Sequence, residues 1–313
     1  MRGQFKRAFF GANAGHRHQP GKGNYEADQG NAMKTIWLVY ESDNVARNRF
    51  FIEQWQKAAQ HEDVQIHLVI YEEMVYGIKE GRPWLEHTGG LPLPDAAVMR
   101  LNQPLLSAHL ETMGIPVFNN ARVARICNDK RLTHQLVSGI VLAMDTVFLR
   151  GDEIDSPLPY PVVLKAVSSC GGRKVFLVKD HEAFQAALAT SSPDKALVQA
   201  LCDTPGKDVR AYVLGKEIIA VMMRYSQHDF RSNLGQGGGA MPYRLSAKDE
   251  QMVRKLISTM DFGLVGIDFL FHGGKLVFNE IEDAVGTRML FAHGYDDIVY
   301  RYLRFILNTL EKK

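Results

Sequence analysis

Three acidic residues near the end of the sequence have the types and spacing of a site for a hard metal ion. Glu280 and Glu282 are two residues apart in a strand pattern, so their carboxylates face the same side of that strand. Asp268 belongs to the apolar run that precedes the Gly273–Gly274 turn. Three carboxylates on one inner face repel one another unless a cation lies between them, and oxygen ligands suit Mg²⁺ or Mn²⁺. Because the acids interrupt apolar runs, the sequence favours a metal site over a solvated strand face.

The register of this hairpin decides whether Asp268 joins the two glutamates. A two-residue turn at Gly273–Gly274 would pair Asp268 with Asn279 and put Glu280 on the other face. A three-residue loop over 273–275 would pair Asp268 with Glu280 directly. The sequence leaves both registers open.

A lysine and a glycine-rich loop in the middle of the chain have the chemistry of a phosphate site. Lys165 stands in an apolar strand pattern, where an ammonium group is costly without an anion beside it. A carboxylate of the chain could be that anion, but the loop 168–173 offers backbone N–H groups of the kind that hold phosphate. The loop is not a P-loop, because it lacks the GxxxxGK[ST] spacing and joins two strands. Cys170, inside it, is interpreted as a small loop residue, since no neighbouring base is evident.

A second glycine cluster follows an arginine and an asparagine. Asp229-Phe-Arg-Ser-Asn233 leads directly into the glycine-rich stretch 234–240. Such a loop can close over a polyanion, although taken alone it is equally well a surface loop with an exposed arginine.

The elements that must position these groups change character along the chain. The first part alternates strands with helices, which is typical of a small doubly wound α/β domain. Its expected elements are strands at Thr35–Tyr40, Gln65–Tyr71, Ala96–Arg100 and Pro116–Asn119, helices at Val45–Gln60 and Pro104–Met113, and an irregular excursion at Gly81–Pro94. The second part predicts an α+β body of antiparallel hairpins with intervening helices. Its expected hairpins are Pro161–Val167 with Lys174–Lys179, Val209–Leu214 with Glu217–Arg224, and Leu264–Phe271 with Lys275–Ile281.

These patterns predict three regions. Residues 1–32 hold six glycines and five basic residues without a sustained apolar period, so they cannot bury enough surface to offset the cost of ordering. They are interpreted as an added leader, a stretch upstream of a natural start at Met33, or a transit peptide. Residues 33–125 form the expected α/β domain. Residues 126–313 form the α+β body, with subdomains at about 126–203 and 204–313.

Composition excludes several classes of protein. No run approaches the ~18 apolar residues of a membrane span. Three cysteines without CxxC spacing make neither a disulfide framework nor a zinc cluster, so a reduced, cytoplasmic location is expected. The formal net charge of +2 belongs to the leader, because residues 33–313 carry 32 basic and 33 acidic residues. No basic patch interleaved with aromatic residues supports binding to nucleic acid. A homo-oligomer is left open.

Together, the segments resemble the RimK-like branch of the ATP-grasp superfamily of carboxylate–amine ligases. The resemblance runs in order from about Asn128 to Arg288, and the DFRSN segment with its glycines is the most specific part. The matching pieces are Asp129-Lys130, Val163-Leu-Lys165 with its loop, Leu197-Val-Gln199, Lys207-Asp-Val-Arg210, Asp229–Asn233, Gly266-Ile-Asp268 and Asn279-Glu-Ile-Glu282 ending in Gly286.

This resemblance implies a two-lobed ATP-grasp fold and a role for each matching residue. Lys130 and Lys165 would hold the phosphates of ATP, covered by the loop that contains Ser168, Gly171 and Gly172. The backbone of Gln199, Ala200 and Leu201 would meet the adenine, and Asp208 would reach the ribose. Arg231, Ser232 and Asn233 would lie at the phosphate and acyl end, and Asp268, Glu280 and Glu282 would hold Mg²⁺ or Mn²⁺.

Three positions depart from the family pattern. The family usually has Asn at the third metal position, where this chain has Glu282. It usually has an acidic residue after the hinge glutamine, where this chain has Ala200. Its small-Pro-Gly ending is here Asp283-Ala-Val-Gly286. These departures bear on metal preference and on selectivity for ATP.

The implied activity is ATP-dependent formation of an amide or peptide bond through an acyl phosphate, with an amino acid as one substrate. Arg210 and Arg288 are candidates for gripping a substrate carboxylate, because a guanidinium fork matches it bidentately. For Arg288, a salt bridge with Asp283 is the competing interpretation, and Glu282 or Asp283 would assist deprotonation of the amine. The rival functions are a phosphotransferase with the same fold and a catalytically silent nucleotide-binding regulator.

Overall fold

A parallel sheet forms the N-terminal part of the protein. The structure is a computed structural model that describes residues 33–168, 174–191, 195–232 and 238–312. The sheet has the strand order β2-β1-β5-β6, with every neighbouring pair parallel. The elements in chain order are β1 (Lys34–Tyr40), α1 (Ser42–Ala59), β2 (Val64–Ile70), a 3₁₀ turn (Tyr71–Glu73), β3 (Met74–Lys79), β4 (Arg82–His87), β5 (Ala96–Met99), α2 (Pro104–Thr112) and β6 (Val117–Phe118).

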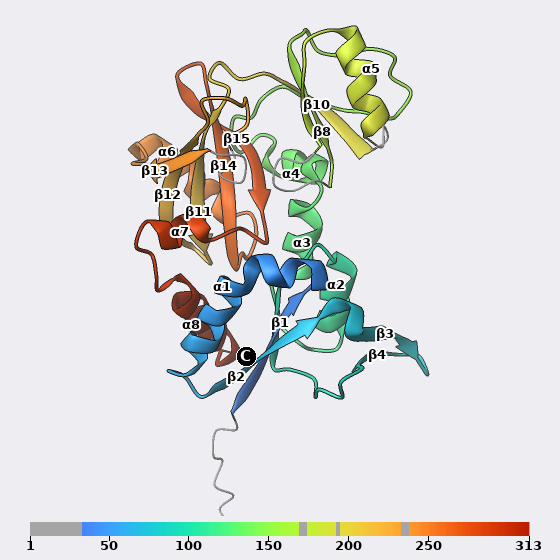
Figure 1. The fold of residues 1–313 in the computed structure, drawn as a ribbon, viewed down its shortest axis with the longest axis vertical. Coiled ribbons are helices and arrows are strands. Elements are labelled where there is room, and N and C mark those ends of the chain that lie inside the picture. Colours follow the sequence, from blue (N-terminus) through green and yellow to red (C-terminus); the bar gives the residue numbers. More distant parts are fainter. Residues whose placement is uncertain (1–32, 169–173, 192–194, 233–237, 313) are drawn as a thin grey trace, which may run out of the picture. The chain divides into compact units, whose positions relative to one another are not determined.

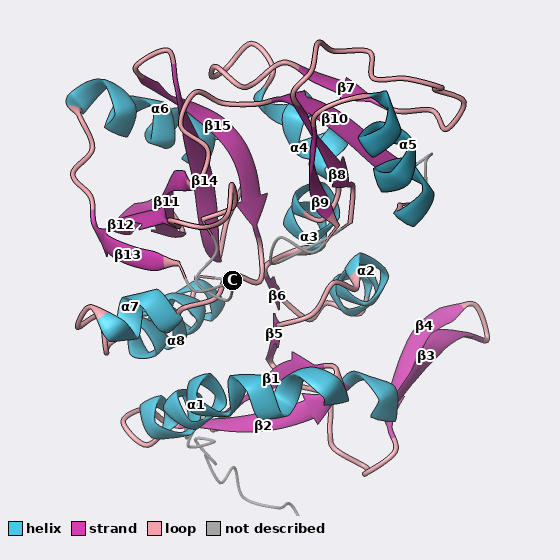
Figure 2. Cartoon of the chain, turned by 45° about the horizontal axis from the view of Figure 1, so that its top comes forward, coloured by secondary structure: helices cyan, strands magenta, loops and turns pink. Residues whose placement is uncertain are grey.

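The central strand β1 shows why this part folds as it does. Its residues from Ile36 to Tyr40 are all buried, because the strand has a neighbour on each side and helices over the sheet. A continuous apolar run is typical of such a strand. The prediction of a parallel α/β arrangement from this run and its neighbours is confirmed (Figure 2).

The interpretation of Gly81–Pro94 as an irregular excursion was wrong for its first half. β3 and β4 form an antiparallel hairpin, with Glu80 and Gly81 at the turn. Both turn residues have positive φ (53° and 75°), which suits a tight two-residue hairpin turn. Pro83 obscured the strand in the sequence, since proline is tolerated only where its missing N–H is not needed, as at a sheet edge.

Two antiparallel sheets make up the second part, as the hairpin patterns predict (Figure 1). The smaller sheet has the order β7-β10-β8-β9 and the larger one β13-β12-β11-β14-β15. Their elements are α3 (Ala121–Cys127), α4 (Lys130–Val137), β7 (Thr146–Phe148), β8 (Val162–Ala166), β9 (Val175–Val178), α5 (His181–Thr190), β10 (Ala196–Ala200), β11 (Lys207–Leu214), β12 (Glu217–Tyr225), β13 (Gly239–Pro242), α6 (Ala247–Ile257), β14 (Leu264–His272), β15 (Lys275–Glu282), α7 (Arg288–Ala292) and α8 (Ile298–Leu310).

One apolar core joins the N-terminal sheet to the larger antiparallel sheet. Helices α1 and α8 lie side by side, and the rings of Trp55 and Tyr302 meet edge to face with centroids 5.5 Å apart (Figure 1). The same core includes Leu38 of β1 and Met222 of β12. The chain's last helix therefore helps to hold the N-terminal sheet against the larger antiparallel sheet.

A buried asparagine adds polar contacts between the same two parts. The side-chain nitrogen of Asn119, directly after β6, donates to the carbonyl of Leu264 at 3.0 Å and to that of Asp283 at 2.6 Å. Its side-chain oxygen accepts from the N–H of Gly263 at 2.6 Å. All these partners flank or belong to the hairpin that carries the three acids, so the N-terminal sheet helps to hold that hairpin in place.

None of the helices in the described ranges combines the length and the apolarity that a membrane span requires.

Candidate functional site

A β-bulge brings the three acids together. The turn at Gly273–Gly274 has two residues, with His272 opposite Lys275, so the three-residue loop considered from the sequence does not occur. The register shifts by one residue next to Asp268, and Glu280 rather than Asn279 becomes its partner. A bulge places two residues of one strand against one residue of the other. The expected pairing of Asp268 with Glu280 therefore arises within the strand and not at the turn.

The three acids form an oxygen-only cluster of the kind that suits a hard cation. One carboxylate oxygen from each of Asp268, Glu280 and Glu282 lies within 4.8 Å of the others. Asp268 is fully buried, and the two glutamates are half-buried. This donor set fits Mg²⁺ or Mn²⁺. The assignment of a metal to it stays a prediction.

Two arginines share the buried acids. Arg210 lies directly opposite Asp268 on the neighbouring strand, and its Nε and Nη2 donate to the two carboxylate oxygens at 2.7 and 2.6 Å. Its Nη2 also lies 2.8 Å from Glu282. Arg224, on β12, donates to Asp268 at 2.7 Å. Burial alone would raise the pKa of Asp268, but the two guanidinium groups hold it below its usual range.

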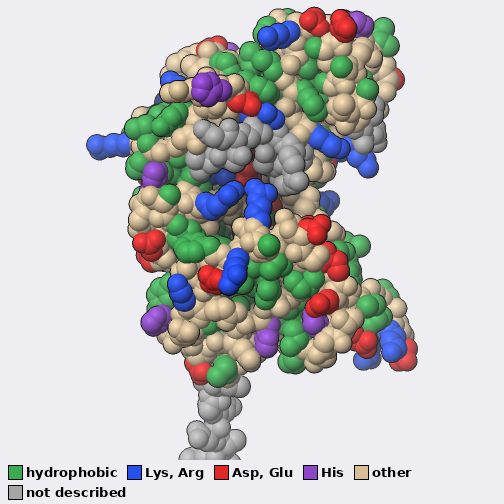
Figure 3. All heavy atoms as spheres, in the orientation of Figure 1, with side chains coloured by type: hydrophobic (Ala, Val, Ile, Leu, Met, Phe, Trp, Pro, Cys, Tyr) green, Lys and Arg blue, Asp and Glu red, His purple; other side chains and the backbone are tan. Residues whose placement is uncertain are grey.

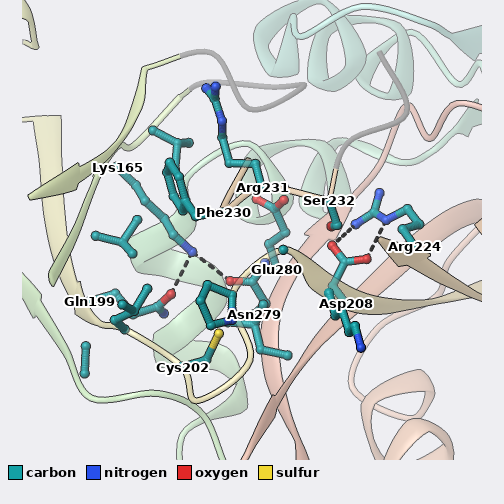
Figure 4. A pocket seen from close by; sticks show the side chains of 18 of the residues that line it. Lys165, Gln199, Cys202, Asp208, Arg224, Phe230, Arg231, Ser232, Asn279 and Glu280 are labelled. Atoms are coloured by element: carbon teal, nitrogen blue, oxygen red, sulfur yellow. Dashed lines mark hydrogen bonds and ion pairs between the residues drawn. The ribbon is translucent and has the colours of Figure 1, made fainter. Parts of the chain in front are cut away.

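Asp208 takes part in the same ion-pair network. It lies opposite Arg224, whose Nε donates to one of its carboxylate oxygens at 2.6 Å (Figure 4). Ser232 also hydrogen-bonds its side chain. The predicted contact of Asp208 with a ribose stays untested, and in this structure its carboxylate is engaged by the chain itself.

Lys165 lies on β8 of the smaller antiparallel sheet. Its side chain points toward the β14–β15 hairpin, which carries the three acids. Its Nζ donates to Gln199 Oε1 and to Asn279 Oδ1, each at 2.7 Å (Figure 4). Burial lowers its pKa to about 8, against the opposing effect of Glu280. Neither direct partner carries a charge, so this ammonium group would gain from an anion in the cavity beside it.

Lys130 approaches the cluster from helix α4. Asp129 caps that helix by accepting from the backbone N–H groups of Arg131 and Leu132, which fixes the first turn. Lys130 is buried, and its Nζ lies 3.6 Å from Glu280. Lys130 therefore contacts Glu280 itself, and Lys165 contacts the neighbouring Asn279.

A cavity of about 90 Å³ between the two antiparallel sheets collects most of the predicted nucleotide residues. Its lining contains the hinge, where the N–H of Ala200 donates to the carbonyl of Asp145 at 2.9 Å and is therefore not free for adenine. Cys202, also in the lining, is a buried free thiol. The predicted residues in this lining are Lys130, Lys165, Gln199, Ala200, Leu201, Asp208, Arg231, Ser232 and Glu280.

A larger cavity, of about 650 Å³, shares Lys130, Arg224 and Glu280 with the lining of the smaller one. Figure 3 shows Lys and Arg side chains gathered around a hollow on one face of the molecule. The lining includes Ser168, which sequence analysis assigned to the cover over the phosphates. Glu282, Arg210 and Arg288 line it as well.

The two predicted carboxylate-gripping arginines differ in how they are held. Arg210 is buried and forked onto Asp268, so it could grip a substrate only by exchanging partners. Arg288 is exposed at the start of α7 and has no ion pair among the described residues. The alternative salt bridge of Arg288 with Asp283 is therefore absent from the described part of the chain, and Asp283 accepts from the side chain of Asn128 at 2.9 Å instead.

Some predicted residues lie outside the described ranges. For three further residues of the site, the sequence analysis predicted no role. Gly171, Gly172 and Asn233 belong to the first group, as does Cys170. Arg224, Asn279 and His134 were missed. Arg224 could have been found, because an arginine in an apolar strand needs an acid opposite it. His134 is buried against Phe278 and near Gln199, and its burial lowers its pKa to about 4.

Comparisons with known proteins support the family resemblance found in the sequence. A family model described as the RimK-like ATP-grasp domain matches residues 139–305, more than half of the chain. A probable alpha-L-glutamate ligase of Legionella pneumophila is 27% identical over 249 residues, which cover 74% of this chain and 81% of that protein.

Two solved structures share the fold. A RimK domain ATP-grasp protein from Sphaerobacter thermophilus superposes with a TM-score of 0.68 at 20% identity, covering 87% of this chain and 99% of the other. A D-alanine–D-alanine ligase from Bacillus anthracis, complexed with ATP, gives 0.67 at 14% identity, covering 89% and 98%. The expected fold class, an α/β domain followed by an ATP-grasp body, is confirmed.

Proposed function

This chain belongs to the RimK-like ATP-grasp family, and on that basis we propose that it is an ATP-dependent, ADP-forming carboxylate–amine ligase. The convergence of Lys130, Lys165, Glu280 and Glu282 on two cavities with shared lining residues, with Asp268 clustered beside the two glutamates, supports this proposal most. The relative named as a probable alpha-L-glutamate ligase favours an amino acid as one substrate.

In the proposed reaction, an oxygen of the substrate carboxylate attacks the γ-phosphorus of ATP. The bond between that phosphorus and the bridging oxygen breaks, ADP leaves, and an acyl phosphate forms. The amine nitrogen then attacks the acyl carbon, the bond to the phosphate oxygen breaks, and the amine loses a proton. A bound Mg²⁺ or Mn²⁺ would offset phosphate charge and orient the oxygens.

The chain's own residues would position and neutralise the phosphates. Lys165 reaches the smaller cavity from β8 and Lys130 reaches it from helix α4, so the two ammonium groups would contact the nucleotide phosphates from different elements. Arg231 lines the same cavity and pairs with Asp229 at 2.7 Å in this structure. During the reaction its guanidinium would turn toward the γ-phosphoryl group that is transferred. Such preorganised cations stabilise the charge that spreads over the phosphoryl oxygens.

Asp268, Glu280 and Glu282 would hold the metal, and Arg210 and Arg224 would limit their mutual repulsion before it binds. Asp283 is our candidate for accepting the amine proton, because it lines the larger cavity and Glu282 is engaged by Arg210. The buried free thiols Cys127 and Cys202 support the cytoplasmic location expected from the sequence.

The experiment that tests the proposal measures release of ADP and phosphate across acids and amines, offered singly and in pairs. ADP release that needs both an acid and an amine, with a matching amide product, supports a ligase. Release that needs only a hydroxyl compound would instead establish a phosphotransferase. Tight ATP binding without turnover of any pair would establish a silent nucleotide-binding protein.

Glu280→Ala should abolish metal-dependent turnover and leave the fold intact, because Glu280 lies in a partly open cavity. The matched control is Glu250→Ala, a partly exposed acid of α6 that pairs with Arg254 and lies in neither cavity lining. Full activity of Glu280→Ala would overturn the metal assignment.

A further inference from the structure

A buried glutamine connects three strands of the smaller antiparallel sheet. Gln199 of β10 is 1% exposed and lies directly opposite Thr146 of β7. On the other side of β10, Lys165 of β8 lies opposite Leu197, two residues before Gln199, so Lys165 and Gln199 are diagonal neighbours on one face of the sheet. A buried amide must satisfy one oxygen and two N–H groups, so its partners decide which way it points.

Lys165 fixes the orientation of that amide. An ammonium group only donates hydrogen bonds, so the Gln199 atom 2.7 Å from its Nζ is the oxygen Oε1 (Figure 4). The nitrogen Nε2 then points away from Lys165, and its two hydrogens need two acceptors. Thr146 Oγ1 is one of them, at 3.1 Å, because the Thr146 hydroxyl gives its own hydrogen to the carbonyl of Met144 at 2.9 Å.

His134 is the second acceptor. Its Nε2 lies 3.4 Å from Gln199 Nε2, which is longer than most hydrogen bonds. The contact is a hydrogen bond only where the imidazole is neutral and carries its proton on Nδ1. The ring is 9% exposed and packs edge to face against Phe278. Burial and the neighbouring charge of Lys165 lower the pKa of His134 to about 4, so the ring is neutral near pH 7 and accepts.

The same face of helix α4 presents His134 and Lys130. The two residues are four apart, which places their side chains one turn apart on one side of the helix, and both are buried. Lys130 reaches Glu280 directly, whereas His134 reaches Lys165 through Gln199. Helix α4 therefore acts on the predicted phosphate site twice, once through a charge and once through a neutral acceptor.

We propose that His134 is a positioning residue of the nucleotide site, which accepts a hydrogen bond from Gln199 and thereby keeps Gln199 Oε1 on the ammonium group of Lys165. Without this acceptor, the amide is free to turn over and present Nε2 to Lys165. Two donors would then face each other, and Lys165 would lose an amide oxygen that holds it beside the smaller cavity. The inference rests on the proposed function, which supplies the phosphates that Lys165 binds.

A double-mutant cycle tests the inference by nucleotide binding, without turnover. The full chain is titrated calorimetrically at pH 7 with a non-hydrolysable ATP analogue and saturating Mg²⁺. His134→Leu removes the acceptor and should weaken binding about tenfold, since a hydrogen bond to a charged group contributes that much. In the Lys165→Met background the same change should weaken binding less than about twofold, because the ammonium group that His134 positions is gone. A histidine that only filled space would weaken binding equally in both backgrounds.

Two further variants separate the acceptor from packing. His134→Gln brings back an acceptor and should bind the analogue within about threefold of the wild type. Thr146→Val removes the hydroxyl acceptor of Gln199 Nε2 and keeps the shape of the side chain. It should weaken binding like His134→Leu, and it carries the test if His134→Leu does not fold. The matched control is His109→Leu, because His109 is a partly buried histidine of α2 that contacts the carbonyl of Trp84 at 2.8 Å and lies in neither cavity lining.

The outcomes separate this inference from the proposed function. Unchanged binding in His134→Leu, equal losses in both backgrounds, no recovery in His134→Gln, or the same loss in His109→Leu would overturn the inference. Failure of the wild type to bind the analogue would overturn the proposed function and the inference with it. Losses confined to the background that retains Lys165, without ADP release for any acid and amine, would support the inference and overturn the ligase.

Discussion

Asp268 and Glu280 lie opposite each other across β14 and β15 because Asn279 is an extra residue in β15. The bulge has two effects on the site. It turns Glu280 to the same face as Asp268, and it leaves Asn279 to accept a hydrogen bond from Lys165 of the other sheet. One local irregularity thus links the predicted metal acids to the predicted phosphate lysine.

The third acid should set the strength of metal binding. Glu282→Asn removes one negative charge from the cluster but keeps an oxygen ligand, so we expect the fold and activity to persist. Metal affinity should fall by about tenfold, because affinity for hard cations follows the charge of the ligands. Binding of Mn²⁺, followed by electron paramagnetic resonance, measures this without turnover. Unchanged affinity would show that Glu282 is not a ligand, and Glu250→Gln is the control.

Nucleotide binding should weaken as the pH rises through about 8. Burial lowers the pKa of Lys165 to about 8, so its ammonium is charged below that pH and neutral above it. Phosphate binds the charged form, and the logarithm of the association constant should fall toward one unit per pH unit above pH 8. Calorimetric titration with ATP between pH 6.5 and 9.5 measures the profile. Lys165→Met should bind ATP more weakly and lose this dependence; a variant that retained it would refute the assignment.

The ion-pair network should be sensitive to loss of a single cation. Arg224→Met leaves Asp208 buried without its guanidinium partner and takes one of two from Asp268, so the free energy of unfolding should drop by about 3–5 kcal/mol. Adding Asp208→Asn should restore part of it, because the buried charge is then gone. Urea unfolding measures both. Arg254→Met, which breaks an exposed pair with Glu250, should change stability by less than about 1 kcal/mol. Equal effects of the two arginine variants would contradict the prediction.

Packing between α1 and α8 should contribute strongly to stability. Trp55 is fully buried and meets Tyr302 edge to face, so Trp55→Ala should lower the free energy of unfolding by about 3–5 kcal/mol. Ile78→Ala, in the β3–β4 hairpin, is the control, because Ile78 is 69% exposed and should tolerate truncation. A loss in Trp55→Ala no larger than in the control would mean that the two helices do not share a tight core.

Most of the regular structure could be predicted from the sequence, since its signals are local. A continuous apolar run predicted β1, and paired β-rich runs around glycine turns predicted the hairpins of the two antiparallel sheets. The β3–β4 hairpin was missed because its pattern is short and includes Pro83. The predicted nucleotide residues in the lining of the smaller cavity could be named because they fall in segments that match a family pattern in order.

The sequence by itself determined which residues carry the charge and the order in which strands and turns deliver them. Only the tertiary structure decided which charges meet. Whether Glu280 faces Asp268 depends on a bulge of one residue, and a strand's side chains change face with every such step. The pairing of β11 with β14 places Arg210 opposite Asp268, and the pairing of β11 with β12 places Arg224 opposite Asp208. Contacts of this kind depend on long-range packing, which no local pattern in the sequence records.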